Sequence, residues 1–179
     1  MTTRTSIRLA VLTALVSGVT VTPGFAQTAG KPSDPQIAHI AYTADEIDIK
    51  SAKLALTKTH NKDVRDFADD MVRDHTAVNE KALALVKKLH VTPQDNPTSQ
   101  SLVKQADAER KKLSSLNGAA FDKAYVDNEV AYHKEVDQAL ETTLIPSAQN
   151  PELKSLLQTG LKIFQGHEQH AEQLASKLK

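Results

Sequence analysis

The hydrophobic residues of this chain recur every three or four positions, which is the spacing that places side chains on one face of an α-helix. In one stretch, for example, Val64, Phe67, Met71 and Val78 fall on a single face. The pattern predicts long helices over residues 34–59, 61–90, 119–147 and 150–178, and a shorter, more polar helix over residues 99–116.

Residues that begin helices mark the boundaries of these stretches. Asp34 precedes Pro35, and Asn150 precedes Pro151, so each pair joins a capping side chain to a proline at the first helical position. Asn61 is a third capping side chain, directly before the second stretch. These signals predict separate helices with short turns near residues 61 and 150.

Four long helices and a short one between the second and the third predict an all-α fold, a ferritin-like four-helix bundle with a helical crossover. The short turns make two antiparallel hairpins. The segment 91–117 is long enough, at about 1.5 Å per helical residue, to run most of the length of the bundle. An up-down-up-down bundle with this segment packed across one end is the alternative that the sequence leaves open.

The first residues have the pattern of a targeting segment. Arg4 and Arg8 precede an apolar run, residues 9–21, that is shorter than the roughly 20 residues of a membrane span. Pro23 follows, and small residues end at Ala26. We expect a signal peptide over residues 1–26, a flexible leader over 27–33 and the bundle domain over 34–179. The mature protein is then periplasmic and has no transmembrane span. The alternative is an N-terminal membrane anchor.

Composition excludes several classes of function. The chain has no cysteine, which rules out disulfides, thiolate metal sites and iron–sulfur clusters, so a metal must be held by His, Asp or Glu. The 22 basic residues balance the 22 acidic ones, so we expect no nucleic acid partner. No glycine-rich phosphate loop, nucleophile elbow, His-Glu-x-x-His zinc motif or EF-hand occurs, and the sequence leaves open whether the protein is an enzyme.

Candidate chemistry lies where polar side chains interrupt the apolar faces. His75, His133 and His167 do so on the second, third and fourth long helices, and Asp48 does so on the first. Glu129 lies one turn before His133. Asp74 and His170, which neighbour this set, are further candidates, whereas His39, His60 and His90 are expected at the surface.

The heights of these residues along the bundle agree. Asp48 and His75 lie 13 and 14 residues from Asn61, and His133 and His167 each lie 17 residues from Asn150. If the two turns are at opposite ends, all four side chains meet near mid-height. A buried imidazole or carboxylate needs a polar partner, and a transition metal is a partner that both accept.

The set therefore predicts one transition metal ion, Zn, Cu or Fe, bound by His75, His133 and His167 with Asp48 or Glu129 as the carboxylate. His170 is an extra ligand in this hypothesis. A mononuclear site is favoured over a di-iron centre because the Glu-x-x-His motif of ferritin-like di-iron proteins is missing from the inward positions. The alternative is a metal-free structural or partner-binding bundle with a hydrogen-bonded histidine layer. Either way, burial predicts histidine pKa values below the usual 6.5.

Several short runs of residues resemble those of a known protein family. Phe67-Ala68, Met71-Val72 and Asp74-His75-Thr76, followed by residues 118–122, Tyr125 and His133, resemble the exported bacterial family catalogued as domain of unknown function 4142. The resemblance implies a ferritin-like bundle in the periplasm or outer-membrane fraction of Gram-negative bacteria and no established activity. The sequence departs from that family in having Asp48 where Glu is usual and in lacking a Leu-Pro before His167.

Overall fold

The computed structural model of the protein describes residues 30–178. The predicted signal peptide and the first part of the predicted leader lie outside the described residues. The helices are α1 Asp34–Lys58, α2 Lys62–Lys88, α3 Pro97–Ser114, α4 Gly118–Ala139, the π-helical turn η1 Leu140–Leu144, α5 Ile145–Ser147 and α6 Pro151–Lys177. No β-strand occurs over residues 30–178, and the predicted all-α fold is confirmed.

The third long helix is not continuous. The sequence predicts one helix over 119–147, whereas the structure divides this segment into α4, η1 and α5. Pro146 has no N–H to donate, so the ordinary hydrogen-bonding pattern cannot continue through this turn. The N–H of Ile145 instead bonds to the carbonyl oxygen of Leu140, five residues earlier, which is the pattern of a π-helix.

Two of the three helix caps predicted from the sequence are present in the structure, and the third is a different residue. Asn61 and Asn150 cap α2 and α6 with their side chains, as predicted. The cap of α1 is Ser33 rather than Asp34. Asp34 accepts hydrogen bonds from the backbone N–H groups of Gln149 and Asn150, both at 2.8 Å, and so ties the start of α1 to the turn before α6.

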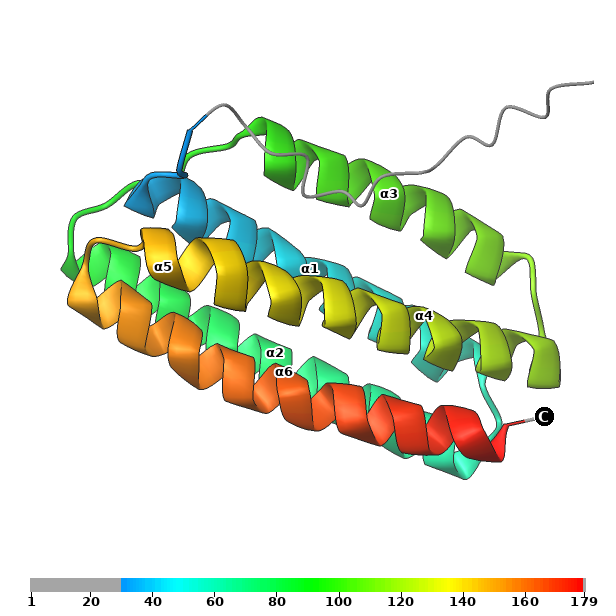
Figure 1. Ribbon diagram of the computed structural model, residues 1–179. Helices are drawn as coiled ribbons and strands as arrows, with labels where there is room; N and C mark the ends of the chain where they lie inside the picture. The colour runs from blue at the N-terminus through cyan, green and yellow to red at the C-terminus, as the bar shows by residue number, and fades with distance from the viewer. Residues whose placement is uncertain (1–29, 179) are drawn as a thin grey trace, which may run out of the picture.

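The chain reverses direction after α1, after α2, after α3 and before α6. In Figure 1, α1 and α6 run one way and α2 and α4 the other, while α3 follows the length of the bundle beside α1. The turns after α1 and before α6 therefore lie at opposite ends. The ferritin-like crossover is confirmed, and the alternative with the connecting segment across one end is wrong, because α3 carries the chain from one end of the bundle to the other.

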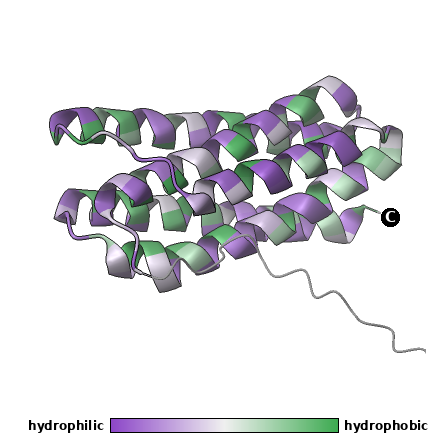
Figure 2. Cartoon of the chain, turned by 90° about the horizontal axis from the view of Figure 1, so that it is seen from above, coloured by the Kyte–Doolittle hydropathy of each residue, from purple (hydrophilic) through white to green (hydrophobic). Residues whose placement is uncertain are grey.

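The buried hydrophobic residues form two clusters, one toward each end of the bundle. The first contains Ile37 and Phe164, and the second contains Phe67 and Tyr125. Figure 2 shows hydrophobic and hydrophilic residues alternating along the helices that supply them. On each long helix of the bundle the two clusters are separated by buried polar residues, and these form a polar layer near mid-height: Asp48, His75, Glu129, His133 and His167. None of the helices over residues 30–178 is both long and apolar enough to span a membrane.

Candidate metal centre

Three histidine rings from three different helices meet in the polar layer. His75 lies on α2, His133 on α4 and His167 on α6, and all three are buried. The ring centroids are 5.2 to 5.7 Å apart. Each ring offers one nitrogen such that the three nitrogens lie within 4.8 Å of one another. Three ligand atoms are therefore within reach of a single ion.

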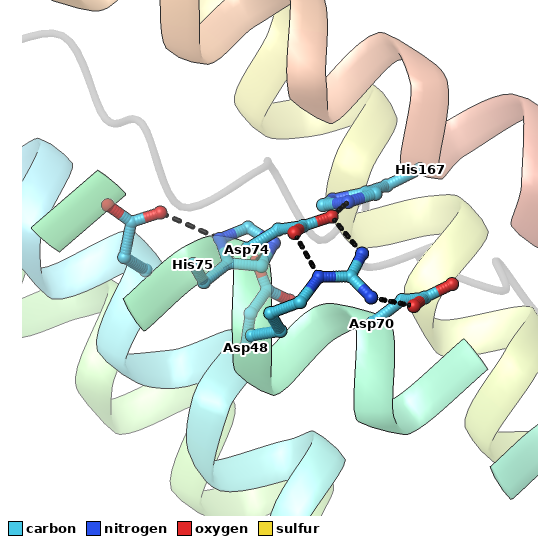
Figure 3. A network of polar contacts seen from close by, with 7 residues as sticks. Asp48, Asp70, Asp74, His75 and His167 are labelled. Carbon is cyan, nitrogen blue, oxygen red and sulfur yellow. Dashed lines mark hydrogen bonds and ion pairs between the residues drawn. The ribbon is translucent and has the colours of Figure 1, made fainter. Parts of the chain in front are cut away.

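One nitrogen of each ring is fixed by a hydrogen bond to a group other than a histidine. His75 Nδ1 lies 2.7 Å from Asp45 Oδ1. His133 Nδ1–H donates to the main-chain oxygen of Glu129 at 3.0 Å, and His167 Nε2–H donates to Asp74 Oδ2 at 3.1 Å. Figure 3 shows the bonds of His75 and His167. Partners of this kind set the tautomer and orientation of metal-ligating histidines.

The second nitrogen of each ring is buried and makes no hydrogen bond to the described residues. These atoms are His75 Nε2, His133 Nε2 and His167 Nδ1. His75 Nε2 lies 3.5 Å from Asp48 Oδ2, which is an ion-pair distance rather than a good hydrogen bond. Three unpartnered nitrogens therefore lie in one buried layer, which is the arrangement that a metal ion would satisfy.

Burial keeps the three rings neutral. It lowers the pKa of His75 to about 4 and that of His133 to about 3. It also lowers the pKa of His167 to about 4, although the hydrogen bond to Asp74 works in the opposite direction. A metal ion binds neutral imidazole and competes with protons, so these rings offer free lone pairs at neutral pH.

Two carboxyl groups complete the layer. Asp48 on α1 and Glu129 on α4 are buried, and with His133 they form a second group whose ligand atoms lie within 4.8 Å of one another. Burial raises the pKa of Asp48 well above its usual value, and the neighbouring Glu129 raises it further. Burial also raises the pKa of Glu129 to about 7. In the absence of a cation, this pair holds a proton at neutral pH.

The layer approaches the surface beside His167. The side chain of Asp74 is 28% exposed, against 9% for that of His167. The Arg73 guanidinium donates to both oxygens of Asp74, at 2.7 and 3.0 Å, and also bonds to Asp70 (Figure 3). These bonds are the largest cause of the lowered pKa of Asp74. Asp74 therefore stays anionic and joins a core histidine to a surface cation.

The structure brings together five of the six site residues predicted from the sequence: Asp48, His75, Glu129, His133 and His167. It does not bring His170 to them. His170 is exposed, and its ring packs edge-on against Phe67 with a centroid distance of 5.1 Å. The reason is geometric. Three residues after His167 the helix has risen almost one turn, and the side chain of His170 points about 60° away from the direction of His167. Asp74 lies outside the layer and bonds to His167 at its edge.

Sequence reasoning missed Asp45, which is buried and bonds to His75. Its spacing carried a signal, because it precedes Asp48 by three residues and therefore faces the same side of α1. His60 and His90 are exposed and His39 is partly exposed, as expected for residues outside the layer.

Residues 19–174 match the family described as Domain of unknown function (DUF4142). The chain belongs to the DUF4142 family. The resemblance noted in the sequence is thereby confirmed, and a search of curated proteins finds no match to this DUF4142 chain.

Among solved structures, the crystal structure of a DUF305 protein from Streptomyces coelicolor is similar to this DUF4142 chain. The sequences are 14% identical and the TM-score is 0.66, over 80% of this chain and 90% of that chain. At this identity the likeness shows a common helical fold and carries no argument about function.

Proposed function

We propose that this DUF4142 protein binds one transition metal ion in the bundle core through His75 Nε2, His133 Nε2 and His167 Nδ1. The observation that carries the proposal is that the two nitrogens of each ring lie in different surroundings. One nitrogen is held by a hydrogen bond to a group other than a histidine, the other is buried without a hydrogen-bond partner, and the three ring centroids lie 5.2 to 5.7 Å apart. Leaving a buried polar atom unsatisfied costs about 1–3 kcal/mol, and a bound ion would remove that cost at three atoms.

The carboxyl groups supply the charge that such an ion requires. Asp48 Oδ2 lies 3.5 Å from His75 Nε2, and ligand atoms of Asp48, Glu129 and His133 lie within 4.8 Å of one another. On binding a divalent cation, the Asp48–Glu129 pair would lose its proton and become the anionic ligand of the site. Three imidazoles with one or two carboxylates suit Zn, Cu or Fe. We assign no reaction to the centre.

The second candidate function is a metal-free bundle in which the histidines form a structural polar layer. The hydrogen bonds to Asp45, to the Glu129 carbonyl and to Asp74 favour this reading, since they satisfy half of each ring and fix how the helices meet. It predicts that added metal neither binds nor stabilises the protein.

Metal titration of the mature protein, purified without a histidine tag, tests the proposal. We expect one ion per chain for Zn²⁺ or Cu²⁺ in competition with a chelator, and nitrogen hyperfine structure from imidazole in the electron paramagnetic resonance spectrum of the Cu²⁺ form. His133→Gln is expected to lower the affinity at least tenfold. His170→Gln is the matched control, because His170 is exposed and outside the layer, and it should bind as the wild type does. Equal affinities in the two variants, or no stoichiometric binding, contradict the proposal.

We also propose that the chain is exported to the periplasm. The support is the basic start, Arg4 and Arg8, followed by the short apolar run and the small residues before Gln27. Cell fractionation and N-terminal sequencing of the recovered protein test this, and Gln27 is the expected first residue. Recovery of the full-length chain from the cytoplasm contradicts it.

A further inference from the structure

An apolar cavity of about 40 Å³ lies at the first hydrophobic cluster, where partly buried residues such as Ala82 and Leu85 also border it. Its walls come from α1, α2, α6 and the segment from α4 into η1. Asp45 is the only polar side chain among the lining residues. A buried water needs two to four polar partners, so this space is poorly suited to water.

The cavity is formed by small residues on several helices rather than by one missing side chain. Ala38, Ala41 and Ala44 lie at three-residue intervals on α1, Ala82 faces them from α2 and Gly160 from α6. Protein interiors are usually packed to the density of organic crystals, so small residues that leave a space on three helices are a specific feature of this sequence.

The π-helical turn borders the same space. Leu140 and Leu144, the first and last residues of η1, both line the cavity. Single π-helical turns within longer helices occur frequently at functional sites, because the extra residue changes the direction of the side chains that follow.

The cavity adjoins the histidine layer directly. Asp45 and Phe164 line it, and both contact His75. Asp45 holds His75 Nδ1 at 2.7 Å, and the Phe164 ring stacks on the imidazole at a centroid distance of 4.8 Å and an interplanar angle of 13°. One aromatic ring therefore separates the apolar space from a histidine of the proposed centre.

We propose that this cavity binds a small apolar molecule of diatomic size, of the class of dioxygen, beside the core histidines. The size argues for this ligand class, because an internal space of about 40 Å³ leaves room for only a few atoms. The apolar walls argue for a ligand without hydrogen-bonding groups. A role beside a metal rests on the proposed function, whereas occupancy of the cavity does not.

Nuclear magnetic resonance of methyl groups in the metal-free mature protein under xenon and dioxygen pressure tests the proposal. Xenon should cause saturable shifts, and paramagnetic dioxygen enhanced relaxation, at Val78, Leu140 and Leu157 in the cavity wall. The methyl groups of Val64 and Val126, in the second cluster, should respond only weakly. Responses spread evenly over both clusters, or no saturable response, would overturn the proposal.

A pair of matched variants tests whether xenon binds in this cavity. Ala82→Leu places a larger side chain in the cavity and should abolish the xenon response, whereas Ala84→Leu on the exposed face of the same helix should leave it unchanged. An unchanged response in a folded Ala82→Leu variant overturns the proposal, and if that variant does not fold, the wild-type pattern of responses decides. His133→Gln separates the two proposals, because it is expected to lose metal affinity and retain the xenon response.

Discussion

The two nitrogens of each core histidine lie in different surroundings, and this difference determines what the residue can do. His167 shows it most clearly, because Asp74 accepts from Nε2 while Nδ1 has no hydrogen-bond partner in the buried layer. Asp74 is in turn held anionic by Arg73. The carboxylate therefore acts as a positioning residue, which keeps the proton on Nε2 and the lone pair on Nδ1.

Asp74→Ala is expected to lower metal affinity about 10- to 100-fold, the usual effect of losing the outer partner of a histidine ligand. The measurement is the dissociation constant for Zn²⁺ in competition with a chelator. Asp70→Ala is the control, since Asp70 also bonds to Arg73 but makes no hydrogen bond to a histidine. If both variants weaken binding equally, general surface charge rather than the orientation of His167 is responsible.

The pKa values of the layer predict opposing effects of pH on stability. His75, His133 and His167 have lowered pKa values, so the unfolded chain binds more protons, and their contribution is full above about pH 6.5 and lost as the pH falls toward 4. Glu129 has a raised pKa of about 7, so its contribution is present at low pH and lost as the pH rises toward 7. In metal-free wild type the two effects offset each other.

A variant with all three histidines changed to Gln should reveal the carboxyl effect alone. We expect its free energy of unfolding to fall as the pH is raised from 5.5 to 7.5. The wild-type change over this interval should be more positive by up to about 4 kcal/mol, which is about 1.4 kcal/mol for each of the three histidines, because a histidine of the unfolded chain takes up its proton only below about pH 6.5. Urea denaturation with chelator present measures both. Identical pH profiles contradict the assignment of these histidines as neutral in the folded state.

At the scale of elements, the helices were predictable because their signals are local. Hydrophobic spacing and the caps Asn61 and Asn150 are read within a few residues of each helix. The π-helical turn was not predicted, because it depends on how the chain relaxes around Pro146 within a packed helix. The tie from Asp34 to the turn before α6 was also missed, since it joins residues 115 and 116 positions apart.

The same distinction applies to the candidate site. Inward positions follow from periodicity, and equal heights follow from counting residues back to a turn, so the meeting of His75 with His133 could be inferred. Which carboxylate faces which ring depends on the rotation of each helix about its axis. A hydrophobic stripe fixes that rotation too coarsely to distinguish Asp45 from Asp48, or to exclude His170.

The cap of α6 gives a prediction at this scale. Asn150 accepts from the backbone N–H groups of Glu152 and Leu153, at 2.9 and 3.1 Å, so Asn150→Ala leaves both without this partner. We expect a loss of about 1 kcal/mol in the free energy of unfolding, measured in urea. Gln158→Ala, on the exposed side of the same helix, should change it by less than about 0.5 kcal/mol. A similar loss in both variants would show that the cost does not come from the cap.

At the scale of the whole molecule, the polar layer separates two apolar clusters and joins the two hairpins. The α1–α2 hairpin supplies Asp48 and His75, and the α4–α6 pair supplies Glu129, His133 and His167. A ligand bound by residues of both hairpins is bound only when the hairpins are packed together. The unfolded chain has no such preformed site, so binding free energy becomes folding free energy.

Metal should therefore stabilise the entire bundle by mass action. With free Zn²⁺ at about 100 times its dissociation constant, the free energy of unfolding should rise by about 2.7 kcal/mol, or about 5–10 °C in melting temperature for a chain of this size. Chelator should reverse the shift. The shift should be lost in His133→Gln and retained in His170→Gln. His133 belongs both to the group of three histidines and to the group that it forms with Asp48 and Glu129, whereas His170 belongs to neither. The metal-free structural alternative predicts instead that all three proteins melt at temperatures independent of both metal and chelator. A thermal melt of each protein with and without Zn²⁺ therefore distinguishes a bundle closed by a metal ion from one closed by hydrogen bonds alone.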